Sequence, residues 1–123
     1  MLNGALILNK PSGISSGVFS RKVKKLLNQK EKVGHAGTLD PLADGVLIVC
    51  IGEMTKFISY LTDETKTYIA EIEIGKTSNT YDSEGDFSNQ KSYDHITKSI
   101  IIVELNNFNF PYVIDTSQEI AKK

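Results

Sequence analysis

The chain is organised around one stretch of sequence, Gly34-His35-Ala36-Gly37-Thr38-Leu39-Asp40-Pro41-Leu42-Ala43-Asp44-Gly45-Val46-Leu47. Three glycines and a proline surround the acidic residue Asp40, and the apolar run 45–51 that follows is typical of a buried strand. A carboxylate held in a shaped loop beside a buried strand can serve as a nucleophile or a general base. Asp before Pro also commonly begins a turn, so a purely turn-forming Asp40 is the alternative interpretation.

Further motifs flank this stretch in a fixed order. They are Leu8-Asn9-Lys10-Pro11-Ser12-Gly13-Ile14-Ser15-Ser16 upstream and, downstream, Gly52-Glu53-Met54-Thr55-Lys56-Phe57, Lys66-Thr67-Tyr68, and Gly75-Lys76-Thr77 through Asp82 and Gly85. Together they resemble the TruB family of pseudouridine synthases over about residues 4 to 108. Asn9 stands where the family usually has Asp, and Asp44 where it usually has Thr or Ser.

The resemblance implies an enzyme that isomerises a uridine in the T-loop of tRNA to pseudouridine without a cofactor or a metal. It implies that Asp40 is catalytic and that His35, Tyr68 and Lys10 contact the substrate: the histidine contacts RNA around the flipped nucleotide and the tyrosine contacts the target uracil. From the residues alone, a loop histidine is more often a surface residue, and a strand tyrosine more often part of the core. The expected partner is tRNA, through its T-arm, and the sequence carries no indication of oligomeric state.

Two other functions stay open at this point. One is a truncated, catalytically inactive remnant that still binds RNA. The other is a metal-dependent hydrolase using His35, Asp40 and Asp44, which the sequence supports weakly because no ligand cluster is complete.

The composition is that of one small globular domain: 123 residues, 40% hydrophobic and 24% charged, with a net charge of −1. The charge is uneven, because residues 1–35 carry seven Lys or Arg and one Glu. This balance of +6 predicts a basic face that meets phosphates, or a merely solvated helix face. The single cysteine, Cys50, excludes a disulfide within the chain and indicates a buried thiol in a reducing, cytoplasmic setting. No window is long and apolar enough to span a membrane.

Hydrophobic periodicity predicts an α+β (α/β) fold, a mixed sheet with helices packed on it. We expect strands at 5–9, 45–51 and 66–74, the last half-buried with Tyr68 on its core side. We expect a helix capped by Ser15 or Ser16, a second over 53–61 and a third over 96–108, with a polar loop at 30–37. The predicted core of the second helix is Met54, Phe57, Ile58 and Leu61.

The resemblance divides the chain into 1–108, the N-terminal part of a truncated TruB-like catalytic domain, and a divergent tail, 109–123. Residues 109–114 do not match the segment that follows in the family. We therefore expect that a later arginine, which pairs with the catalytic aspartate in the family, and a PUA RNA-binding domain are absent. Such a tail would suit a frameshifted or interrupted gene, and an artificially joined sequence is equally compatible. We also expect exposed sheet edges, one uncovered sheet face and weak stability.

Overall fold

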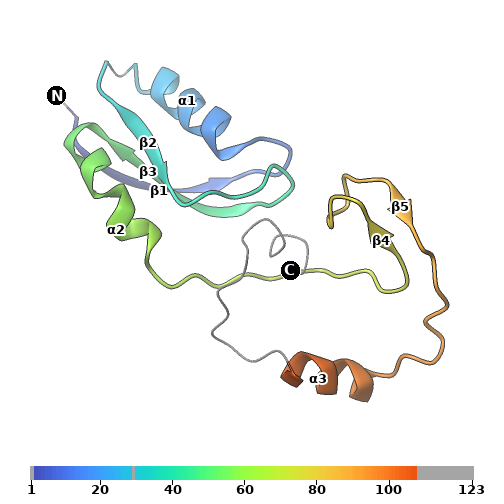
Figure 1. Cartoon of the computed structure of the whole chain (residues 1–123). Helices are drawn as coiled ribbons and strands as arrows, with labels where there is room; N and C mark the ends of the chain where they lie inside the picture. Colours follow the sequence, from blue (N-terminus) through green and yellow to red (C-terminus); the bar gives the residue numbers. More distant parts are fainter. Residues whose placement is uncertain (1, 29, 108–123) are drawn as a thin grey trace. The chain divides into compact units, whose positions relative to one another are not determined.

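Two units divide the chain between Lys66 and Thr67 (Figure 1). This computed structural model describes residues 2–28 and 30–107. Each unit is considered by itself below.

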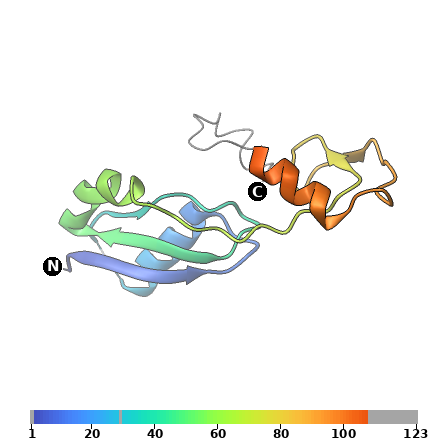
Figure 2. The same cartoon turned by 90° about the horizontal axis from the view of Figure 1, so that it is seen from below.

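The first unit is built on a three-stranded sheet with the order β1-β3-β2 (Figures 1 and 2). Its strands are β1 (Gly4–Lys10), β2 (Val33–Ala36) and β3 (Gly45–Ile51). Both outer strands pair with β3 in antiparallel fashion, with Leu8 opposite Leu47 and His35 opposite Val49. The α+β class is confirmed, and the strands at 5–9 and 45–51 are found. Every pairing among the described residues is antiparallel, so the expectation of a mixed sheet is corrected.

Helix α1 (Ser16–Leu26) lies across one face of this sheet (Figure 2). Ser15 is its N-cap, and the Ser15 hydroxyl accepts the Val18 N–H at 3.3 Å. Period-two alternation turns Leu47 and Val49 toward the helix, where they form the core with Val23. Leu39, in the loop before β3, packs against the same core. The helix and the loop therefore share one apolar centre.

The opposite face of the sheet is only partly covered in the described residues. Ile7 and Val46 are 75% and 70% exposed, whereas Cys50 on the same face of β3 is fully buried. Burial raises the pKa of the Cys50 thiol. The prediction of a buried cysteine is confirmed, and the prediction of an uncovered sheet face holds only around Ile7 and Val46.

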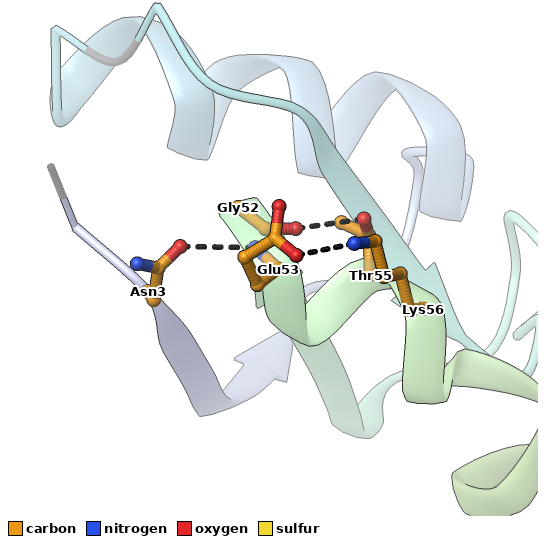
Figure 3. A network of polar contacts seen from close by, with 5 residues as sticks. All are labelled: Asn3, Gly52, Glu53, Thr55 and Lys56. Atoms are coloured by element: carbon orange, nitrogen blue, oxygen red, sulfur yellow. Dashed lines mark hydrogen bonds and ion pairs between the residues drawn. The ribbon is translucent and has the colours of Figure 1, made fainter.

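A polar network joins the first residues of the chain to the turn after β3 (Figure 3). The Glu53 N–H donates to Asn3 Oδ1 at 2.9 Å, and the Thr55 hydroxyl donates to the Gly52 carbonyl at 2.7 Å. Gly52 has a φ of +62°, and an added Cβ would lie 2.9 Å from the Leu2 carbonyl oxygen, so only glycine fits this turn. The hydrogen bond and charge of Lys56 lower the pKa of the exposed Glu53 carboxyl.

Two expectations in the first unit are corrected. Strand β2 occupies the 30–37 segment that was expected to be a loop, because pairing with β3 outweighs its weak strand propensity. The segment expected to be one helix is a 3-10 helix, η1 (Gly52–Phe57), followed by α2 (Ile58–Thr62). A 3-10 helix repeats every three residues, so the i, i+4 pattern no longer forms one buried face. None of its four expected core residues is buried, and Phe57 is 51% exposed.

The second unit contains a two-stranded antiparallel pair, β4 (Thr77–Ser78) with β5 (Phe87–Ser88), and helix α3 (Lys98–Asn107). The third helix is therefore confirmed, except that residue 108 and the tail 109–123 lie outside the described residues. In the loop between β4 and β5, the Thr80 hydroxyl and the Glu84 N–H donate to the Asp82 carboxylate and lower its pKa.

The predicted strand at 66–74 is wrong. No strand is assigned there among the described residues, and every residue from 66 to 74 is exposed. Tyr68 is 49% exposed, so it does not lie on the core side of a strand. A strand exists through hydrogen bonds to a neighbour, which alternation alone does not supply.

Candidate active site

Asp40 begins a tight turn between β2 and β3. The Ala43 N–H donates to the Asp40 carbonyl at 3.1 Å, and Pro41 follows Asp40 in the position that favours such a turn. The alternative interpretation was that Asp40 only shapes a turn. The backbone of Asp40 does form such a turn. Its half-buried carboxylate takes no part in a hydrogen bond or an ion pair within residues 2–28 and 30–107. The side chain is therefore available for other chemistry.

The segment between β1 and α1 holds the Asp40 turn on both sides. The buried Ser16 hydroxyl donates to the Leu39 carbonyl and accepts the Leu39 N–H, each at 2.9 Å. The Gly13 N–H donates to the Pro41 carbonyl at 2.7 Å. The residues immediately before and after Asp40 are therefore anchored to the same short segment.

Lys10 lies at the end of β1, and none of its side chain is exposed. Its ammonium donates to the carbonyls of Pro11 and Ile14 at 2.9 and 2.8 Å. These bonds offset part of the cost of burying a charge and fold the 10–14 segment around it. The expected contact of Lys10 with the substrate stays a prediction, and the bonds that the structure shows give Lys10 a structural role in the 10–14 segment.

His35 lies on β2 with its ring orientation set by a local contact. Its Nδ1 is 2.6 Å from the Gly37 carbonyl oxygen, and because a carbonyl only accepts, Nδ1 carries the hydrogen. Gly37 has a φ of +79°, which favours glycine, and its N–H donates to the Thr62 hydroxyl at 3.2 Å. The imidazole is half-buried and leaves Nε2 directed away from this contact.

A cleft of about 400 Å³ lies between α1 and β2, and His35 lines it. Arg21 and Lys24, three residues apart on α1, also line it, and neither forms an ion pair in the described part of the chain. The other lining residues are Gly17, Ser20, Val33, Gly34 and Ile58. The size and charge of the cleft suit an anionic group of a larger ligand.

Two candidate residues remain, Tyr68 and Asp44. Tyr68 belongs to the second unit and is described only there. Asp44 is exposed at the end of the loop. His35, Asp40 and Asp44 do not form a cluster that could hold a metal ion, and no such group of three exists among the described residues. The described residues also contain no helix long and apolar enough to cross a membrane.

Comparison with known proteins identifies the family. Residues 24–114 match the model of the TruB family pseudouridylate synthase N-terminal domain. The chain belongs to the TruB family. It is 45% identical over 107 residues to tRNA pseudouridine synthase B of Dehalococcoides mccartyi strain BAV1, and 45% identical over 108 residues to that of Bacillus subtilis strain 168. Each alignment covers 87% of this chain and 35% of the relative. A third relative, tRNA pseudouridine synthase B of Blochmanniella pennsylvanica, is 52% identical over 84 residues, which are 68% of this chain and 32% of the relative.

The chain thus spans about a third of the length of the TruB relatives it matches. Sequence reasoning missed Ser16 and Gly13 as anchors of the Asp40 turn. The signal was present, because both belong to the upstream motif that carries the TruB resemblance. Ser16 was considered only as a helix cap, a position that Ser15 occupies.

Proposed function

We propose that this chain is the N-terminal part of a tRNA pseudouridine-55 synthase, in which Asp40 is the catalytic carboxylate. The reaction breaks the bond between N1 of uracil and C1′ of ribose and rejoins the base through C5. Asp40 would attack C1′ or C6, or remove a sugar proton. The single observation that carries this proposal is the anchoring of the Asp40 turn, because the residues on both sides of Asp40 are hydrogen-bonded to the segment between β1 and α1.

His35 supports the RNA side of the proposal. A duplex or stacked uridine must leave its neighbours before reaction, which costs roughly a few kcal/mol. The hydrogen bond from Nδ1 to the Gly37 carbonyl fixes the imidazole five residues before Asp40. There the imidazole can occupy the space that the flipped uridine leaves in the T-loop. Tyr68 is proposed as the stacking partner of the uracil, a contact worth roughly 1–3 kcal/mol. Lys10 is not proposed as a substrate contact.

The cleft supports binding of the RNA backbone. Arg21 and Lys24 form its cationic wall, and it extends from His35 along α1. A phosphate of the T-arm placed there would be attracted by both cations and would release counterions from the RNA. The charge balance predicted a basic face that meets phosphates. We propose that Arg21 and Lys24 are the residues of that face that contact the RNA.

A second candidate function is RNA binding without catalysis. It is favoured by one observation, that no cation pairs with Asp40 among the described residues. On this alternative the 123-residue chain binds a T-arm RNA but converts none of it.

A fused enzyme tests the first candidate, with residues 1–107 of this chain replacing the matching part of the Bacillus subtilis relative. The substrate is a T-arm RNA, and the control RNA has cytidine in place of the T-loop uridine. Liquid chromatography coupled to mass spectrometry, which separates pseudouridine from its isomer uridine in nucleoside digests, should detect pseudouridine only from the first RNA. A folded fused enzyme that binds this RNA and forms no pseudouridine would contradict the proposal. The 123-residue chain assayed in parallel tests the second candidate, which requires binding without conversion.

A further inference from the structure

The Ser16 hydroxyl makes an unusual pair of contacts with a residue 23 positions away. It donates to the carbonyl of Leu39 and accepts the N–H of the same residue, both at 2.9 Å. One hydroxyl thus replaces the two backbone bonds that a neighbouring strand would supply. Ser16 is 1% exposed, so water does not compete for these bonds.

Leu39 is also held by its side chain, which packs against the core of Val23, Leu47 and Val49. On the other side of Asp40, the Pro41 carbonyl accepts the Gly13 N–H. Asp40 therefore sits between two fixed peptide groups. The freedom left to its carboxylate is mainly rotation about its own side-chain bonds.

Ser16 is itself held firmly. It lies in the first turn of α1, and its carbonyl accepts the Ser20 hydroxyl at 2.9 Å. One turn further along, Val23 packs the helix onto the sheet. The Asp40 turn is thus hydrogen-bonded to a helix that packs on the core, and not to another loop.

We infer that Ser16 is a positioning residue for the Asp40 carboxylate, a role that rests on the function proposed above. Its hydroxyl fixes the peptide plane that leads into Asp40 and so sets where the carboxylate meets the sugar and base. Catalytic groups need placement within about 0.5 Å, and a misplacement of 1 Å costs on the order of 100-fold in rate. Loss of the Ser16 hydroxyl removes two of the three hydrogen bonds that anchor the turn, so it should slow the chemical step more than it weakens RNA binding.

Two matched variants test this role, Ser16→Ala and Ser15→Ala. Both remove a serine hydroxyl from the N-terminal end of α1, but only the Ser16 hydroxyl bonds the loop, whereas the Ser15 hydroxyl accepts the Val18 N–H. In the 123-residue chain, NMR should show exchange of the Leu39 amide hydrogen accelerated about tenfold or more by Ser16→Ala and much less by Ser15→Ala, while β3 amides keep their protection. If Ser16→Ala unfolds, Ser16→Cys replaces it, because a thiol of similar size accepts and donates only weakly. Equal acceleration by both variants, or none at Leu39, would overturn the inference.

Activity supplies the second readout, in the fused enzyme. We expect Ser16→Ala to lower kcat by about 10- to 100-fold with KM changed less than about threefold, and Ser15→Ala to change kcat less than about twofold. If Ser16→Ala and Ser15→Ala have the same kcat, the positioning role is overturned, even if Asp40→Asn is inactive. Activity retained by Asp40→Asn would instead overturn the proposed function. The two failures are thus distinguished by separate variants.

Discussion

The ammonium of Lys10 lies 2.8 Å from the carbonyl oxygen of Ile14, with none of the lysine side chain exposed. A buried cation stabilises a protein only when its donors are satisfied, and here the acceptors belong to the loop that leads into α1. Lys10 thereby shapes the segment whose Gly13 and Ser16 anchor the Asp40 turn. Lys10 thus supports the Asp40 turn through the backbone of the segment between β1 and α1.

Replacement of Lys10 by Met should destabilise the first unit. The thioether cannot donate, so the carbonyls of Pro11 and Ile14 lose a charged donor, and we expect a cost of about 2–4 kcal/mol. Urea unfolding followed by alkylation of Cys50 reports this unit selectively, because the single cysteine is buried in β3. Lys22→Met, an exposed position, is the matched control and should stay within about 0.5 kcal/mol of wild type. Equal unfolding midpoints for the two variants would show that the Lys10 contacts contribute nothing.

The cleft between α1 and β2 makes a prediction about salt dependence. Arg21→Ala with Lys24→Ala should weaken binding of a T-arm RNA by the 123-residue chain. It should also reduce the log–log salt slope by roughly 2, about one for each lost phosphate contact. The control pair, Lys22→Ala with Lys25→Ala, removes the same charge from the same helix outside the cleft. Equal slopes for the two pairs would show a general charge effect and not a site in the cleft.

Cys50 makes a prediction about pH. Its raised pKa means that the folded state keeps its proton while the unfolded chain loses it. Its contribution to stability is fully present below the unfolded pKa of about 8.5 and decreases as pH rises from there through the folded pKa. Unfolding free energies measured by urea denaturation between pH 7 and 10 should fall more steeply for wild type than for Cys50→Val. Parallel pH curves for the two proteins would contradict a native thiol pKa raised by burial.

Elements with a strong local sequence signal could be predicted, and elements that depend on pairing with a distant strand could not. β3 and α1 carry their own signals, a continuous apolar run and an apolar stripe with a serine cap, and both are found as predicted. β2 has little strand propensity and forms because β3 offers it an edge. Residues 66–74 alternate like a strand but pair with no described strand. Here the local pattern predicted a strand that is not found, whereas for β2 it predicted a loop where a strand is found.

The candidate site shows the same limit at the level of side chains. The turn at Asp40 was predictable because Asp before Pro commonly begins one, whereas the catalytic role of Asp40 comes from the TruB resemblance and stays a prediction. The anchor from Ser16 to Leu39 joins two motifs 23 residues apart, and no periodicity reports such a contact. The burial of Lys10 against the backbone carbonyls of Pro11 and Ile14 was not predicted either, because no periodicity reports these contacts, and its contact with substrate stays a prediction.

The central claim is that the Asp40 carboxylate performs the isomerisation, and Asp40→Asn in the fused enzyme tests it most directly. The amide keeps the size of the side chain but is a far weaker nucleophile and base. Asp44→Asn is the matched control, the same change at an exposed position of the same loop. We predict that Asp40→Asn forms no pseudouridine above background and binds the T-arm RNA within about threefold of wild type, while Asp44→Asn keeps most of the activity. Turnover by Asp40→Asn comparable to that of Asp44→Asn would contradict the account.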